Sequence, residues 1–216
     1  MARASGGSGA GSGRASHRGG PGAGRRGQLR IIGGRLRGRR LPVPDQRGLR
    51  PTTDRVRETL FNWLAPDIAG SRCCDCFAGS GALGFEAFSR GAAEVVLVER
   101  AAAVAAVLRA NAELLCAAAG GPGGRMSVVT ADVLRWLATA EPKPFDIVFL
   151  DPPFEQAITG LACELLQRGW LAPAALIYLE TPATGAPPPL PAGWQLIRER
   201  VAGQVRYALA RCEPVN

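Results

Sequence analysis

Four consecutive residues of this 216-residue chain have types and spacing suited to a specific chemistry: Asp151-Pro152-Pro153-Phe154, directly after an apolar run at 147–150. Two prolines at the end of a strand stiffen the turn and remove two N–H donors. The turn then offers acceptors, the Asp151 carboxylate and the Pro152 carbonyl, beside the ring of Phe154. Those acceptors could hold both hydrogens of an exocyclic base amine while the ring stacks on the base. This geometry favours attack of the amine lone pair on a methyl group; the alternative is a purely structural proline turn.

A second segment, Asp75 to Gly84 (DCFAGSGALG), follows another short apolar run and contains glycines at Gly79, Gly81 and Gly84. Glycine lets the backbone turn sharply and approach a ligand closely. The spacing fits the dinucleotide-binding fingerprint imperfectly, because a carboxylate stands before the loop. An acid there repels phosphate and attracts a cationic ligand such as S-adenosylmethionine, which carries a sulfonium and an ammonium group. Alone, the glycines are weak evidence, since a structural turn has the same composition.

Two further acids follow the next two strands that the sequence predicts. Glu99 stands at the end of the second strand, where doubly wound folds place an acid on ribose hydroxyls. Asp132 comes just after the third strand and could accept a hydrogen bond from an adenine amino group. The alternatives are a solvated acid at a strand end for Glu99 and a cap of the following helix for Asp132.

The elements that must position these residues alternate between strand and helix from residue 72 onward. This order predicts an α/β fold, a doubly wound and mostly parallel sheet covered on both faces. A closing hairpin at 195–201 and 205–210 should add an antiparallel edge strand. The remaining expected strands are 72–77, 95–98, 126–130, 147–150 and 174–179, and the expected helices are 83–90, 101–117, 133–138 and 157–168.

Another helix is expected within residues 50–64, ahead of the first of these strands. Thr53 or Asp54 can supply the N-cap oxygen. Apolar residues at helical spacing define its buried face, and polar residues its exposed face. The apolar set is Val56, Leu60, Trp63 and Leu64, and the polar set is Arg55, Glu58 and Asn62.

The excess of basic over acidic residues is confined to the N-terminal fifth of the chain. The formal net charge is +8, yet no acid precedes Asp45, and ten arginines lie within residues 1–44. Two partly apolar runs within 29–43 flank Gly33-Gly34 and predict a hairpin with its turn at those glycines. The arginines at and after this turn could contact phosphates, although a solvated edge ribbon is the alternative. These residues are Arg35, Arg37, Arg39 and Arg40.

Composition sets the expected organisation and excludes several classes of site. Residues 1–28 are rich in Gly, Ser and Arg and should be a disordered tail, with a transit peptide as the minor alternative. A hairpin extension at 29–49 and one domain at 50–216 follow. His17 is the single histidine, which removes Ser-His and Cys-His catalysis. Without an export signal or an apolar run long enough for a bilayer, we expect a cytoplasmic protein with reduced cysteines, Cys73 and Cys76 among them in the core.

Several segments together resemble one known family. Asp151 to Phe154 matches the Asp/Asn-Pro-Pro-aromatic motif of amino-directed methyltransferases. With that motif, four more segments are similar to the bacterial 16S ribosomal RNA guanine-N2 methyltransferases. They are RIIGG at 30–34, RPTTDRVRETLFNWL at 50–64, DCFAGSGALG at 75–84 and VAGQV at 201–205. The resemblance covers about residues 30–211, and the 50–64 segment with the hairpin narrows it to this family.

The resemblance implies a seven-stranded methyltransferase sheet, S-adenosylmethionine as cofactor, S-adenosylhomocysteine as product and no metal. It implies ribosomal RNA as partner, within the small subunit or its assembly intermediate. We also expect a monomer, and the lack of a long apolar run predicts no membrane binding. Asp151, Pro152, Pro153 and Phe154 would hold a target base that is flipped out or unpaired. The implied cofactor-binding residues are Thr52, Thr53, Arg55, Asp75, Phe77, Ala78, Gly79, Ser80, Gly81, Gly84, Glu99 and Asp132. Glu155 departs from expectation, because a basic residue would suit an RNA site there.

Other targets remain open on the residues alone. The same four-residue turn serves enzymes that methylate DNA adenine or cytosine amines and enzymes that methylate protein glutamine. The basic hairpin argues against a protein substrate but does not separate RNA from DNA. The acid before the glycine loop argues against a nicotinamide dehydrogenase. An intact cofactor loop together with an intact Asp-Pro-Pro-Phe turn argues against a non-catalytic RNA-binding module.

Overall fold

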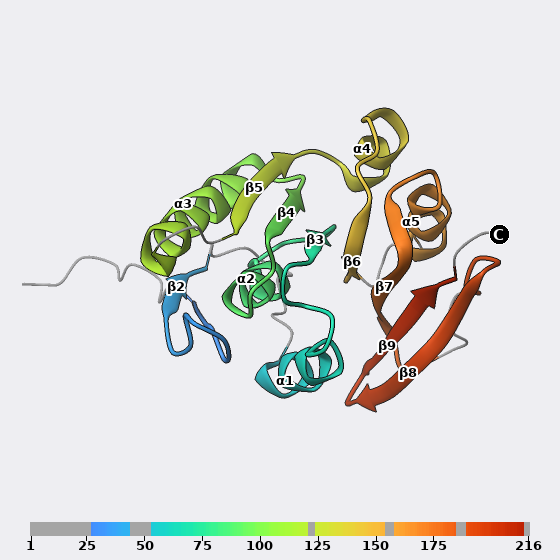
Figure 1. The fold of residues 1–216 in the computed structure, drawn as a ribbon, viewed down its shortest axis with the longest axis horizontal. Coiled ribbons are helices and arrows are strands. Elements are labelled where there is room, and N and C mark those ends of the chain that lie inside the picture. Colours follow the sequence, from blue (N-terminus) through green and yellow to red (C-terminus); the bar gives the residue numbers. More distant parts are fainter. Residues whose placement is uncertain (1–26, 44–52, 121–123, 154–157, 185–188, 214–216) are drawn as a thin grey trace, which may run out of the picture.

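The computed structural model describes residues 27–43, 53–120, 124–153, 158–184 and 189–213. Within them, a seven-stranded sheet lies between two groups of helices, and a two-stranded hairpin packs beside one group (Figure 1). This confirms the α/β fold that strand–helix alternation predicts. The expected tail at 1–28 falls almost wholly outside the described residues.

The large sheet has the strand order β5-β4-β3-β6-β7-β9-β8. The first five strands in this order are parallel. Strand β9 runs antiparallel to both β7 and β8, and β8 and β9 form a hairpin at this end of the sheet. The strands are β3 (Arg72–Asp75), β4 (Glu94–Glu99), β5 (Arg125–Thr130), β6 (Phe145–Leu150), β7 (Leu171–Pro182), β8 (Trp194–Ala202) and β9 (Val205–Cys212). The expected antiparallel edge strand is therefore confirmed.

Helices cover both faces of the sheet, as the buried residues of each helix show. Apolar side chains of α1 (Asp54–Trp63), α2 (Ala82–Ser89) and α3 (Ala102–Ala119) share one core with the hairpin. Those of α4 (Val133–Thr139) and α5 (Thr159–Leu166) form a second core on the opposite face. The central strands contribute to both cores, which explains why they read as continuous apolar runs.

Helix α1 begins as expected, with Thr53 as its N-cap: the Thr53 side chain accepts a hydrogen bond from the Val56 N–H at 3.4 Å. Val56, Leu60 and Leu64 are buried, and Arg55 is exposed. Arg57, which the periodicity assigns to neither face, is also buried, with its side chain only 1% exposed.

Helix α3 corrects one expectation, because its 18 residues are long and apolar enough to cross a bilayer by length and composition. Its apolar stripe, which includes Val104, Leu108 and Leu115, packs into the core against β4 and β5. A third of the helix is buried, which is typical of a helix that covers one face of an α/β sheet.

The N-terminal hairpin is present, but its turn is not where the glycine pair predicts. Strands β1 (Gln28–Arg30) and β2 (Arg40–Pro42) pair with Leu29 opposite Leu41, so residues 31–39 form the connection. Gly33 and Gly34 instead lie against the C-terminal end of α2. A Cβ on Gly34 would overlap the Ser89 carbonyl, and a Cβ on Gly33 would overlap the Arg90 guanidinium. The glycines serve close packing rather than a tight turn.

The cysteines of β3 lie in the core, as expected. Cys73, Cys74 and Cys76 are fully buried, and burial raises the pKa of the Cys73 thiol to about 12. The two sulfurs that approach each other are those of Cys74 and Cys76, at 3.6 Å. A thiol with so high a pKa is a poor nucleophile and a poor metal ligand.

Candidate functional site

The candidate site lies where the connections of the sheet change direction. From β3 the chain proceeds to β4 and β5 on one side, then returns to β6 on the other side of β3. In doubly wound sheets, ligands bind outside the carboxyl ends of the strands at this switch point. Asp75 ends β3 and Asp151 begins the loop after β6, and both were predicted as site residues. Register supports this arrangement, since Asp75 pairs with Phe149, two residues before Asp151.

The glycine loop after β3 is shaped by its backbone conformation. Gly79 and Gly81 have φ values of 48° and 79°, in the left-handed region that favours glycine. A Cβ on Gly81 would also overlap the Phe85 ring, so a larger residue there would displace the start of α2. The Ala78 N–H donates to the Val98 carbonyl at 3.0 Å, which ties the loop to the end of β4. Ala78, Gly79 and Ser80 are buried, and Phe77 is half-buried.

Asp75 lies beneath this loop, with its side chain only 2% exposed. Its Oδ2 accepts a hydrogen bond from the Gly84 N–H at 3.0 Å, so the carboxyl group joins β3 to α2. Burial, with a smaller contribution from the negative charge of Glu99, raises the pKa of Asp75 to about 7. Asp75 therefore fixes the position of the loop, and a pKa of about 7 lets its charge change near neutral pH.

Glu99 ends β4 and binds two backbone N–H groups. Its Oε2 accepts from Gly79 at 3.1 Å and its Oε1 accepts from Ala101 at 2.7 Å. Each carboxylate oxygen has two acceptor sites, so ribose hydroxyls could bind the same carboxylate. Asp132 follows β5 and caps α4, with its Oδ1 accepting from the Arg135 N–H at 3.0 Å. The capping alternative for Asp132 is thus confirmed.

The turn after β6 presents Asp151 half-buried, Pro152 buried and Pro153 exposed. Phe154 and Glu155 lie outside the described residues, as does Thr52. Thr53 and Arg55, at the start of α1, are exposed. The structure therefore brings Asp132, Glu99, Asp75 and Asp151 to one edge of the sheet, in the order of strands β5, β4, β3 and β6.

Sequence reasoning missed two residues near Asp151. The Tyr178 hydroxyl donates to Glu180 Oε1 at 2.6 Å, and Glu180, near the end of β7, is only 4% exposed. Burial and the carboxylates of Glu180 and Asp151 raise the pKa of the Tyr178 phenol well above its ordinary value. Glu180 carried a usable signal, because it follows an apolar strand, as Glu99 does.

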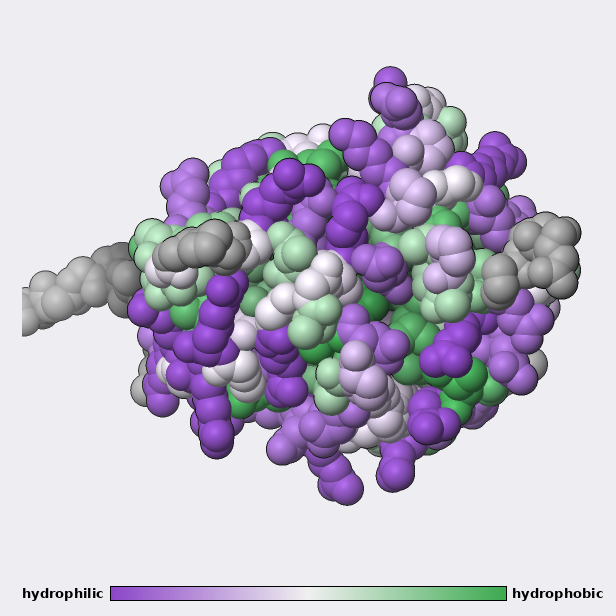
Figure 2. Space-filling model, in the orientation of Figure 1, coloured by the Kyte–Doolittle hydropathy of each residue, from purple (hydrophilic) through white to green (hydrophobic). Residues whose placement is uncertain are grey.

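The arginines of the hairpin differ in their surroundings. Arg35 lies over the Phe88 ring, with its guanidinium carbon 4.7 Å from the ring centroid. Arg40 is 3.5 Å from the Gln28 side-chain oxygen across the hairpin. Arg37 and Arg39 are exposed on the connection. Figure 2 shows hydrophilic residues over this region, at the lower left of the view.

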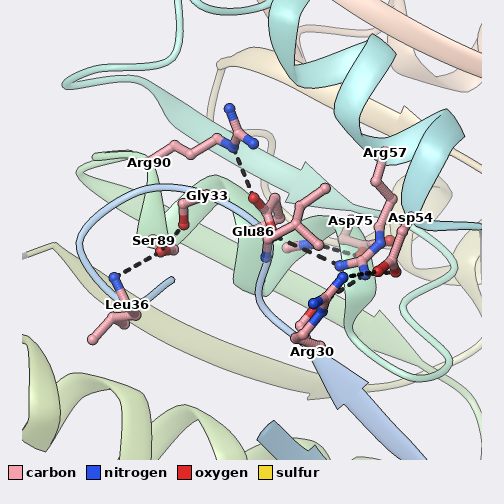
Figure 3. Close-up of polar contacts among 11 residues, drawn as sticks. Arg30, Gly33, Leu36, Asp54, Arg57, Asp75, Glu86, Ser89 and Arg90 are labelled. Carbon is pink, nitrogen blue, oxygen red and sulfur yellow. Dashed lines mark hydrogen bonds and ion pairs between the residues drawn. The ribbon is translucent and has the colours of Figure 1, made fainter. Parts of the chain in front are cut away.

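A buried polar cluster fastens this hairpin to α1 and α2 (Figure 3). Arg57 and Glu86 are 1% and 0% exposed, and Arg57 Nη1 is 3.6 Å from Glu86 Oε2. Arg57 Nη2 donates to Asp54 Oδ1 at 2.6 Å and to the Arg30 carbonyl at 2.9 Å. Glu86 Oε2 accepts from the Ile32 N–H at 2.9 Å, and Glu86 Oε1 accepts from Arg90 Nε at 2.8 Å. The cluster joins three segments that are distant in sequence.

The fold and the proteins similar to this chain show a methyltransferase of the α/β class that uses S-adenosylmethionine. The solved structure of the Escherichia coli protein yhhF, described as a methyltransferase, has a TM-score of 0.78 and 49% identity, covering 87% of this chain and 99% of that one. A Haemophilus influenzae structure described as a methylase has a TM-score of 0.73 and 42% identity, covering 87% of this chain and 100% of that one.

The chain belongs to the family named Conserved hypothetical protein 95, whose model matches residues 29–211. It is 53% identical to the ribosomal RNA small subunit methyltransferase D of Escherichia coli strain K12, over 87% of this chain and 91% of that protein. The protein of the same name from Haemophilus influenzae is 47% identical, over 85% of this chain and 94% of that protein. The family resemblance read from the sequence is thereby confirmed.

Proposed function

We propose that this protein transfers a methyl group from S-adenosylmethionine to the exocyclic N2 amine of a guanine in 16S ribosomal RNA. One observation carries the proposal: the Asp151 turn and the glycine loop flank the switch point of the sheet, in a chain 53% identical to a protein named as a small-subunit ribosomal RNA methyltransferase. The substrate is ribosomal RNA in the small subunit or its assembly intermediate, and the enzyme acts as a cytoplasmic monomer.

The residues along the sheet edge fit this cofactor. Gly79 and Gly81 have left-handed backbone conformations and no side chains, so a ligand can come close to the loop backbone. Acids at the ends of three strands suit a ligand with a sulfonium, an ammonium and ribose hydroxyls. Glu99 would hold the ribose and Asp132 the adenine amine, while Thr52, Thr53 and Arg55 would border the methionine end. When bound, the cofactor supplies an electrophilic methyl group.

The target amine would be held by the turn after β6. The Asp151 carboxylate and the Pro152 carbonyl accept its two hydrogens, and Phe154 stacks on the base. Methyl transfer is direct, so most of the rate enhancement comes from holding the amine in line with the methyl group. Asp151 orients the neutral amine and accepts its proton after methyl transfer.

RNA, DNA and protein targets can be separated in one comparison. We expect radiolabel from S-adenosylmethionine to enter the RNA of small subunits taken from cells that lack this protein. Duplex DNA and proteins of the same subunits should remain unlabelled. Label in DNA or in protein alone would refute the proposed substrate while leaving the methyltransferase class intact.

Cofactor affinity should rise with pH between about pH 6 and about pH 8, because Asp75 has a pKa of about 7. Below this pKa the carboxyl group is neutral, and above it the carboxylate attracts the cationic ligand. The free energy of unfolding should change in the opposite direction, because the pKa of Asp75 is higher in the folded state than its value of 3.8 in the unfolded state. The stabilisation from Asp75 is therefore complete below about pH 4 and is lost as the pH rises through about 7. Isothermal titration at several pH values measures the affinity.

The matched control for this pH dependence is Asp75→Asn, which keeps an oxygen for the Gly84 N–H and removes the titration. The amino group of the ligand titrates in a similar window, so only the difference between parent and variant is attributed to Asp75. The same change of cofactor affinity with pH in the two proteins would show that the charge of Asp75 does not affect cofactor binding.

The exposed hairpin arginines should contribute RNA affinity rather than turnover. Arg37→Ala combined with Arg39→Ala removes two phosphate contacts, which we expect to raise the KM for small subunits about tenfold at low salt and to flatten its salt dependence. Turnover at saturating substrate should be unchanged. Steady-state kinetics at several salt concentrations measure both quantities, and a KM equal to that of the parent would show that the hairpin does not contact RNA.

A further inference from the structure

Helix α2 links the candidate cofactor site to the hairpin. Its N-terminal end follows Gly81, and Gly84 in its first turn is bonded to Asp75. Its C-terminal half holds the hairpin through the side chains of Glu86 and Ser89 and through the Ser89 carbonyl, while Arg90 bonds to Glu86. All eight helical residues are buried, and a helix of this length spans about 12 Å. It therefore forms a short, fixed spacer between the two functional regions.

The hairpin cannot be rigid without this attachment. Each of its strands has three residues, and an isolated two-stranded hairpin is marginally stable at best. The close approach of Gly33 and Gly34 to the end of α2 brings the connection onto the helix. On the other side, Asn111 of α3 donates to the Pro42 carbonyl at 3.0 Å.

The contacts at the end of α2 are directional and reach individual backbone atoms. Ser89 Oγ donates to the Gly33 carbonyl at 2.6 Å and accepts from the Leu36 N–H at 3.0 Å. Glu86 accepts from the Ile32 N–H at 2.9 Å, while Arg57 holds the Arg30 carbonyl. Apolar packing alone would tolerate sliding of the connection. Buried polar groups of this kind are best attested as devices that fix register.

We propose that Glu86 and Ser89 are positioning residues for methyl transfer, which set the distance between RNA phosphates on the hairpin and the target amine at Asp151. The proposal rests on the proposed function, since it requires RNA on the hairpin. Phosphate contacts fix the orientation of a nucleic acid on a protein, so a displaced hairpin displaces the base. A misplacement of about 1 Å can lower a rate about a hundredfold.

Kinetics of two conservative variants test this role. Glu86→Gln retains an acceptor for Ile32, and Ser89→Ala leaves no buried charge unpaired. We expect each to lower kcat on unmethylated small subunits about tenfold at saturating substrate, with cofactor affinity within about twofold of the parent. The comparison variant is Arg168→Ala, an exposed residue after α5 on the opposite face of the sheet, which should match the parent in kcat, KM and cofactor affinity. Circular dichroism confirms the folded fraction of each protein.

Three outcomes contradict the proposal. A rise in KM with unchanged kcat would mean that the hairpin supplies affinity alone. A parallel loss of cofactor affinity would mean that the two residues only maintain the fold of α2. If Glu86→Gln does not fold, an unchanged kcat in Ser89→Ala decides against positioning. A parent protein that binds cofactor but methylates no ribosomal RNA would overturn the proposed function itself, which separates that failure from the other three.

Discussion

Replacement of Asp151 by alanine is expected to lower turnover on small subunits at least about a hundredfold while leaving cofactor affinity unchanged. Asp151 follows β6 at the switch point, where it can accept a hydrogen from the target amine and later its proton. The cofactor loop follows the neighbouring strand and makes its own contacts with Gly84, Glu99 and Val98. Single-turnover kinetics and isothermal titration measure the two quantities separately.

Two controls define what the Asp151 result means. Asp151→Asn retains an oxygen acceptor but removes the charge, so its turnover should lie between that of the parent and that of Asp151→Ala. Asp146 lies at the opposite end of the same strand, where its carboxylate accepts from the Arg72 N–H at 2.7 Å. Asp146→Ala should leave turnover unchanged. Equal losses of turnover and cofactor affinity in Asp151→Ala would contradict the proposal that Asp151 binds the target amine.

Replacement of Arg57 by methionine should lower the free energy of unfolding by about 3 kcal/mol, because it leaves part of a buried ion-pair network uncompensated. Arg57 is 1% exposed, and its loss removes one cation from Glu86, which is fully buried. Arg90 remains as a partner at 2.8 Å, so the loss should lie at the lower end of the range for broken buried pairs. Urea denaturation measures the change.

The matched control is Arg55→Met, on the exposed side of the same helix, which should change stability by no more than about 0.5 kcal/mol. The double variant Arg57→Met with Glu86→Gln should recover part of the loss, since it removes both buried charges. A loss of less than about 1 kcal/mol in Arg57→Met would contradict the idea that the pair is integral to hairpin docking.

The fold class and the placement of the four acids at one edge of the sheet could be predicted from the sequence, because both depend on local patterns. Apolar runs that alternate with helical segments predict a mostly parallel sheet covered on both faces, and the acids at 75, 99, 132 and 151 lie at or just after the ends of those runs. Glycine at 79 and 81 indicates left-handed backbone, which the φ values confirm. These features require no knowledge of distant contacts.

The features that sequence analysis missed depend on partners far along the chain. Helical periodicity assigns charged residues to solvent, so Arg57 and Glu86 could not be recognised as buried without the contacts of Arg30 and Ile32. A Gly-Gly pair permits both a tight turn and a close backbone approach, and only the position of α2 decides between them.

The most direct test of the account identifies the modified nucleoside. Labelled S-adenosylmethionine, this protein and small subunits from cells that lack it are incubated, and the RNA is digested and separated. We predict a single labelled product, N2-methylguanosine, in the reaction with the parent and almost none in the reaction with Asp151→Ala. Label in another nucleoside, or equal label with both proteins, would contradict the assignment of a guanine amine held by Asp151.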